Sequence, residues 1–86
     1  MVRYPVKATK LEVLEFIRRR RIVTIMDLID QFGYRYWGAR RRLYRFNKEG
    51  LVEPFQEDFD EVPYDQVRWG ITETGINKLA YYGKIK

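Results

Sequence analysis

Residues 38–53 have the sequence GARRRLYRFNKEGLVE, which carries the strongest structural signal in the chain. Three apolar residues in it recur at helical spacing: Ala39, Leu43 and Phe46. Because residues four and seven positions apart lie on one face of an α-helix, the pattern predicts a helix over about 36–49 with this face buried. Gly50 is expected to end it, since glycine is favoured just past a helix C-terminus.

After this helix the chain changes from helical to β-prone residues. Residues 51–55, LVEPF, predict a strand, and Pro54 places it at a sheet edge or a bend because proline cannot donate to a ladder. Residues 56–65 are acidic and predict a long hairpin loop. Residues 66–71, QVRWGI, are then expected to return as the second strand.

Two helices are predicted on the N-terminal side, and each begins at a threonine. Thr9 is followed three residues later by a glutamate, the capping-box pattern, and the first helix continues from it to the arginine run at 18–21. Residues 22–23 are a short β-prone pair. Thr24 caps the second helix, which covers about 25–32.

Only three residues, Gly33-Tyr34-Arg35, separate the second helix from the third. Residues 25–49 therefore predict a helix–turn–helix. A fourth helix opens at 72–76, and its inward-facing residues are expected to be Ile76, Leu79 and either Ala80 or Tyr81. The predicted fold class is mainly α with a small β-hairpin (α+β), in a single domain over 1–86.

The composition excludes several classes of chemistry. The 86-residue chain has no cysteine and no histidine, which excludes disulfides, thiol nucleophiles and the usual zinc ligands. We therefore expect no enzyme activity, no cofactor and no metal site, and no small-molecule ligand is evident. The sequence shows no signal peptide and no apolar run near the roughly 20 residues of a membrane helix, so a cytoplasmic location is expected.

Charge is unevenly distributed along the chain. The net charge is +5, but residues 1–50 carry 13 basic and 5 acidic side chains, whereas residues 51–71 carry one basic and six acidic ones. A basic excess of this size favours a polyanion or an acidic surface as the partner.

Three stretches stand in a particular order: LIDQFG at 28–33, GARRRLYRFNKEGLVE at 38–53 and WGITETG at 69–75. They resemble the first helix and turn, the recognition helix with the start of the wing, and the entry to the last helix of the winged helix-turn-helix family. That family includes the MarR-, PadR- and ArsR-like prokaryotic transcriptional regulators. The resemblance spans about residues 9–82 and implies sequence-specific binding of double-stranded DNA and regulation of transcription.

The resemblance implies that helix 36–49 enters the major groove and that a homodimer matches two half-sites. The dimer contact is expected in helix 76–82, or in residues 4–6 with the first helix. Opposite the buried face of helix 36–49 the sequence places cations interleaved with aromatics. The residues expected to contact DNA are Tyr34, Arg35, Trp37, Arg40, Arg41, Tyr44, Arg45 and Lys48, with Arg68 from the second strand.

Three points of this site leave alternatives open. The cationic face could be a solvated surface, and Trp37 could fold back onto the second helix. Arg35 stands where the family often has a capping Ser or Thr, and a guanidinium cannot accept hydrogen bonds from the helix amides. Those amides could bind a phosphate, or Tyr34, water or another segment could cap them.

The acidic loop favours a different class of function. Its carboxylates at Glu57, Asp58, Asp60 and Glu61 would repel a duplex, so a protein-interaction module is an alternative, and RNA binding is another. Their spacing lacks the glycine and terminal glutamate of a calcium loop. The arginines at 18–21 are expected mainly to stabilise the end of the first helix. Those not needed for that role could contact a flanking DNA backbone or pair with Glu12 and Glu15.

Overall fold

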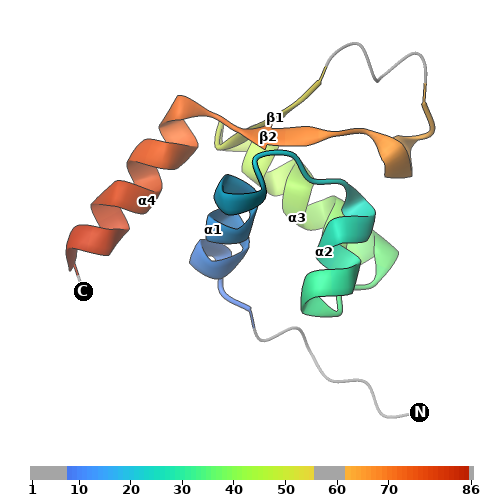
Figure 1. The fold of residues 1–86 in the computed structure, drawn as a ribbon, viewed down its shortest axis with the longest axis horizontal. Helices are drawn as coiled ribbons and strands as arrows, with labels where there is room; N and C mark the ends of the chain where they lie inside the picture. The colour runs from blue at the N-terminus through green and yellow to red at the C-terminus, as the bar shows by residue number, and fades with distance from the viewer. Residues whose placement is uncertain (1–7, 56–61, 86) are drawn as a thin grey trace.

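The computed structural model describes residues 8–55 and 62–85, and within these ranges it contains four α-helices and one two-stranded antiparallel sheet (Figure 1). The helices are α1 (Lys10–Arg20), α2 (Ile25–Phe32), α3 (Tyr36–Lys48) and α4 (Glu73–Ile85). The strands are β1 (Val52–Pro54) and β2 (Trp69–Ile71), and a short 3-10 helix, η2 (Tyr64–Gln66), precedes β2. The predicted class, mainly α with a small antiparallel sheet, is confirmed.

Capping side chains place the first two helix starts where the sequence predicted them. The Thr9 hydroxyl accepts a hydrogen bond of 3.1 Å from the Glu12 amide at the start of α1. At α2 the capping box is reciprocal, because the Thr24 hydroxyl accepts from the Asp27 amide at 3.4 Å and the Asp27 carboxylate accepts from the Thr24 amide at 2.9 Å. These bonds satisfy backbone donors that a helix N-terminus otherwise leaves without partners.

The end of α3 turns directly into β1 through a Schellman motif. The Gly50 amide donates to the Asn47 carbonyl oxygen at 2.9 Å, and the Leu51 amide donates to that of Phe46 at 2.8 Å. Gly50 has a φ of 77°, a conformation that glycine adopts without steric cost. The Asn47 side chain also donates to the Val52 carbonyl oxygen at 3.0 Å, so the helix and the strand are held in a fixed relation.

The sheet is extended by one bridge from the N-terminal half of the chain. The register of β1 and β2 pairs Val52 with Ile71, Glu53 with Gly70 and Pro54 with Trp69. Val23, between α1 and α2, forms an isolated antiparallel bridge with Trp69 through backbone hydrogen bonds of 2.9 and 2.7 Å. β2 begins at residue 69 rather than at the predicted 66, because Gln66 belongs to η2.

The core lies between α1, α2, α3 and the sheet. The predicted buried face of α3 is confirmed, with Ala39 and Leu43 fully buried and Phe46 1% exposed. The other fully or almost fully buried side chains are Val13, Leu14, Ile17, Val23, Ile25, Leu28, Leu51, Val52, Val67 and Trp69.

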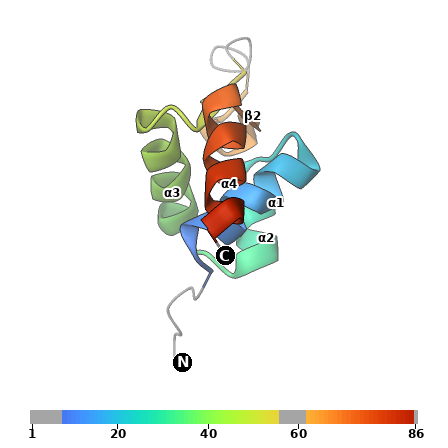
Figure 2. The ribbon, with the colours of Figure 1, turned by 90° about the vertical axis from the view of Figure 1, so that its left-hand side faces the viewer.

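The last helix, α4, diverges from the other three and contacts α1 along one side (Figures 1 and 2). Of the residues predicted to face inward, Leu79 packs against the core. The prediction is wrong for the others: Ile76 is 42% exposed, Tyr81 is 62% exposed, and Ala80 is also exposed. Helical periodicity identifies an apolar face, but it does not say whether another element covers that face.

Among the described residues, none of the helices combines the length and the apolar character that crossing a membrane requires.

Candidate nucleic-acid interface

The solvent side of α3 presents aromatic and cationic side chains together. Trp37, Arg41, Tyr44 and Lys48 follow one another at intervals of four, three and four residues, and Arg45 lies beside them on the helix. We call these five residues the outer face of α3. All five are exposed, Trp37 to 68% and Tyr44 to 58%. The predicted orientation of the helix is confirmed, and Trp37 does not fold back into the core.

The cations of the outer face have no acidic partner among the residues that the structure describes. Within residues 8–55 and 62–85, Arg41, Arg45 and Lys48 have no ion pair, and the first turn of α3 contains no acidic residue. Three positive charges on about two turns of one helix create a local potential that attracts anions.

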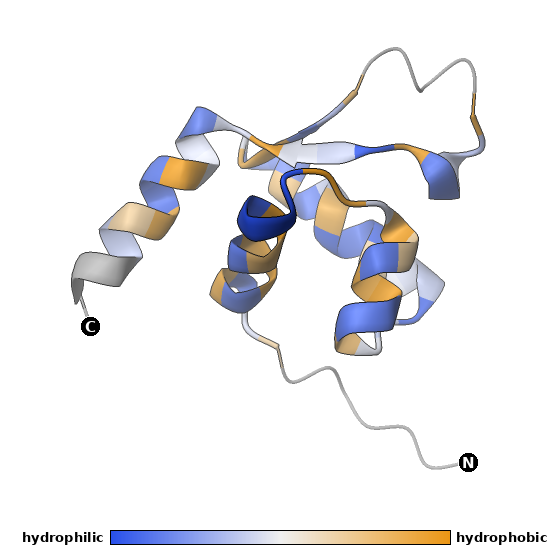
Figure 3. Cartoon of the chain, in the orientation of Figure 1, coloured by the Kyte–Doolittle hydropathy of each residue, from blue (hydrophilic) through white to orange (hydrophobic). Residues whose placement is uncertain are grey.

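The arginines at the end of α1 are in a different environment. The Arg18 guanidinium lies 3.9 Å from the Glu15 carboxylate, and that of Arg20 lies 3.8 Å from the Asp27 carboxylate and 5.7 Å from the Phe16 ring centroid. Figure 3 shows this last turn of α1 as a strongly hydrophilic segment. The predicted pairing with Glu15 is confirmed, and cations at a helix C-terminus also interact favourably with the helix dipole.

The expectation that Tyr34 belongs to the exposed face is wrong. Its side chain is only 8% exposed, packs edge-on against Phe32 with ring centroids 6.1 Å apart, and accepts a hydrogen bond of 3.4 Å from the Arg42 Nε. Tyr34 precedes the first residue of α3, so the helical phase that we used to orient it does not apply. Arg42 is drawn inward with it and lies over the Phe46 ring, 5.6 Å from the centroid.

The start of α3 agrees with the sequence-based expectation. Arg35 occupies the N-cap position, is exposed, and makes no side-chain capping hydrogen bond. The solvent-facing first turn of α3 therefore has a cation beside it rather than a capping oxygen.

Arg40 is half-buried and lies between two aromatic rings. Its guanidinium carbon is 4.1 Å from the ring centroid of Tyr64, in η2, and 5.1 Å from that of Trp37. Arg40 is among the residues expected to contact DNA, but the sequence does not indicate Tyr64 as its neighbour. The two residues are 24 positions apart in the chain, and no local pattern indicates that η2 folds back beside α3.

Arg68 belongs to the hairpin and not to the outer face. It is exposed, and its guanidinium carbon lies 4.9 Å from the ring centroid of Phe55. The acidic residues predicted to repel a duplex, at 57–61, lie outside the described residues, so their role stays a prediction. Asp65, the last acid of that segment, is half-buried in η2.

A hollow of about 520 Å³ adjoins the outer face, lined by Trp37, Arg40, Arg41, Tyr44 and Tyr64. Four of these residues come from α3 and the fifth from η2, so the hollow exists only because the hairpin lies beside the helix. It combines aromatic rings with two guanidinium groups.

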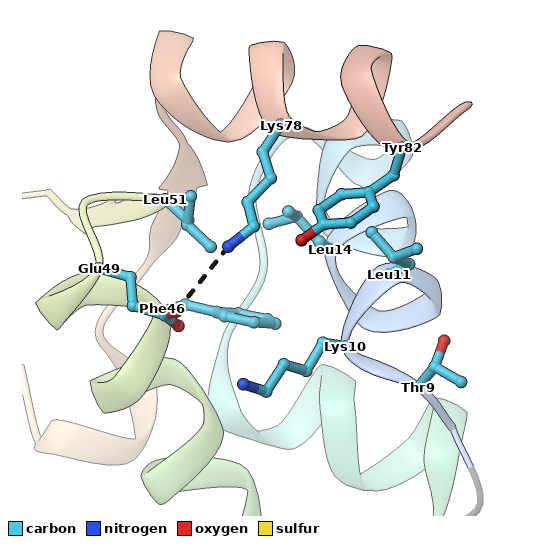
Figure 4. Close-up of a pocket in the computed structure, with 9 residues that line it drawn as sticks. All are labelled: Thr9, Lys10, Leu11, Leu14, Phe46, Glu49, Leu51, Lys78 and Tyr82. Carbon is cyan, nitrogen blue, oxygen red and sulfur yellow. Dashed lines mark ion pairs between the residues drawn. The ribbon is translucent and has the colours of Figure 1, made fainter. Parts of the chain in front are cut away.

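A second hollow, of about 290 Å³, lies between α1, the C-terminal end of α3 and α4 (Figure 4). The apolar side chains of Leu14, Phe46 and Leu51 line it, and the Lys78 ammonium lies 3.9 Å from the Glu49 carboxylate across one side. This ion pair ties α4 to the end of α3. Among the residues that the structure describes there is no cluster of three or more acidic side chains that could hold a metal ion.

Comparison with known proteins gave no match: no family model, no curated protein and no solved structure is significantly similar to this chain.

Proposed function

We propose that the protein is a winged-helix protein that binds double-stranded DNA sequence-specifically through the outer face of α3 and regulates transcription. The observation that carries the proposal is the set of exposed cations on α3, interleaved with Trp37 and Tyr44, that form no ion pair with the described part of the chain. Arginine and lysine neutralise phosphates, and arginine also donates two hydrogen bonds to guanine in the major groove. The proposed activity is binding alone, without catalysis.

The order of the elements supports the winged-helix assignment. A hairpin follows α3 directly, and Val23 supplies a short strand-like bridge to the hairpin ahead of the two central helices. A helix of this length, about 20 Å long and 10–12 Å across, fits the roughly 12 Å wide major groove. Arg41 and Arg45 are one helical turn apart, about 5–6 Å between Cβ atoms, which is close to two base-pair steps of about 3.4 Å each.

We further propose that the protein acts as a homodimer. Exposed apolar side chains on α4, Ile76 and Tyr81 above all, suit a contact between two copies, and DNA-binding dimers of helix–turn–helix type match two half-sites.

The test is a binding titration with a labelled duplex at several salt concentrations. With about 4–6 phosphate contacts for each chain, the log–log slope of affinity against salt is expected near about −4 to −5, because each neutralised phosphate releases a counterion. Arg41→Ala should weaken binding to a selected site by about 1–3 kcal/mol if this residue contacts a base.

The matched control is Arg19→Ala, which removes an exposed arginine from the end of α1. We expect a smaller loss that is equal for selected and random duplexes. Equal, small effects of both substitutions would show that α3 is a solvated surface. Tighter binding to RNA than to DNA would favour the RNA alternative, and binding that does not depend on salt would contradict the proposal.

A further inference from the structure

The hollow beside the outer face is lined by aromatic rings, and two of these rings contact other side chains of the protein. Arg40 bridges Trp37 and Tyr64, at 5.1 and 4.1 Å from their ring centroids. Tyr36 packs edge-on against Trp37, with centroids 5.3 Å apart and planes at 84°, and Tyr64 packs against the buried Trp69 at 6.5 Å. Two of the three rings of the hollow, those of Trp37 and Tyr64, are therefore positioned by neighbouring side chains, which lowers the ordering required when a ligand binds.

The ring of Trp37 nevertheless remains largely uncovered by the protein. Its side chain is 68% exposed and that of Tyr44 is 58% exposed, whereas Trp69 is only 3% exposed. Large aromatic side chains stabilise a fold by burial, and these two bury little of their surface. Their surface is available to a flat ligand, and Arg40 and Arg41 on the same hollow favour an anionic one.

A fully paired duplex does not use such a surface well. In the major groove a protein meets the edges of the bases, while the faces are stacked on one another. The faces become accessible only when a base is unpaired, and then they stack on aromatic and guanidinium planes beside a cationic path for the backbone.

We propose that the hollow formed by Trp37, Arg40, Arg41, Tyr44 and Tyr64 binds an unpaired base of a DNA strand whose phosphates lie along the cations of α3. This inference rests on the proposed DNA binding and specifies the form of DNA that is bound most tightly.

The test compares two duplexes of equal length and equal phosphate number. They differ at one central position, where a base faces either its complement or an abasic site and is therefore unpaired. We expect the protein to bind the second duplex about 5- to 100-fold more tightly, which is the effect of one base stacking on an aromatic ring. Quenching of tryptophan emission should accompany this binding, because Trp37 is exposed and Trp69 is not.

Four variants separate stacking from other causes. Trp37→Ala and Tyr44→Ala should each reduce the preference toward 1. Both residues belong to the outer face of α3, so affinity for the paired duplex is also expected to fall, and the ratio of the two affinities is the quantity compared. Trp37→Phe, which keeps a ring, should retain part of the preference. Tyr81→Ala removes an equally exposed tyrosine from α4, outside the hollow, and should leave the ratio of the two affinities unchanged.

The outcomes distinguish the binding of an unpaired base in the hollow from the proposed binding of duplex DNA. A ratio near 1 with tight binding to both duplexes would overturn this inference and leave the proposed duplex binding intact. A high ratio that survives Trp37→Ala and Tyr44→Ala would also overturn it, because the preference would then come from the flexibility of the DNA. Failure to bind either duplex would contradict the proposed function itself.

Discussion

At the scale of single residues, Gly75 lies where the first turn of α4 passes closest to the rest of the fold. A Cβ at this position would overlap the Leu51 carbonyl oxygen and the Ile71 side chain. The Leu51 carbonyl is held in place, because it accepts the Thr72 amide at 2.9 Å. The Thr-x-x-Gly pattern at this helix start thus has a steric reason.

We therefore expect Gly75→Ala to lower the free energy of unfolding by about 1–3 kcal/mol, the usual cost of forcing extra volume into a packed site. The control is Gly38→Ala, whose added Cβ would lie 3.5 Å from the Tyr34 ring, an ordinary contact. That variant should be more stable than the wild type by about 0.5–1 kcal/mol, because alanine favours a helix over glycine. Urea unfolding measures both, and equal effects would contradict the close approach at Gly75.

At the scale of elements, Thr72 connects the start of α4 to the end of α3. Its hydroxyl donates to the Gly50 carbonyl oxygen at 2.6 Å and accepts from the Gly75 amide at 3.0 Å. One side chain therefore provides a hydrogen-bond partner for an amide at the start of α4 and for a carbonyl oxygen in the turn after α3. The ion pair between Lys78 and Glu49 is a second contact between α4 and the end of α3.

Removing this hydroxyl should loosen α4. We expect Thr72→Ala to cost about 1–2 kcal/mol of unfolding free energy, the range for a lost N-cap, with faster amide exchange in the first turn of α4. Thr72→Ser keeps the hydroxyl and should remain close to the wild type. An alanine variant as stable as the serine variant would show that the two hydrogen bonds contribute nothing net.

The bounds of the helices were predictable because the signals are local. Thr24 and Gly33 bracket α2 at the predicted residues, and Gly50 ends α3 as expected. A capping side chain or a left-handed glycine interacts with backbone groups within about four residues of the helix end. Both partners of the interaction are therefore close together in the sequence. The strands were less predictable, and both are shorter than their β-prone segments.

At the scale of the whole molecule, the solvent-facing surfaces of two helices differ in chemistry. α3 presents cations with aromatics, and α4 presents apolar and aromatic side chains that the rest of the described chain does not cover. This difference is the basis for assigning DNA contact to α3 and self-association to α4.

The assignment of α4 predicts that Ile76→Glu converts a dimer into a monomer. A carboxylate introduced into an apolar contact loses hydration without gaining a partner, so association should weaken by at least tenfold, about 1.4 kcal/mol. Sedimentation measures the change in mass.

Gln31→Glu, at an exposed position on α2, adds the same charge elsewhere and should leave the dimer intact. A wild-type protein that sediments as a monomer at its highest soluble concentration would refute the dimer. Equal loss of association in both variants would show that the added negative charge weakens the dimer wherever it stands, and would contradict a contact through α4.

The chain's local chemistry was enough to predict four helices, the threonine caps of α1 and α2, the glycines that end α2 and α3, and the exposed cations of α3, because periodicity and capping depend on neighbours in the sequence. It was not enough for three features of the site and its surroundings: the burial of Tyr34, the contact of Arg40 with Tyr64, and the exposure of Ile76. Each depends on how segments distant in the chain pack together. Whether a side chain is buried depends on which element packs against it. A sequence pattern shows which face of a helix is apolar, but not which element lies opposite that face.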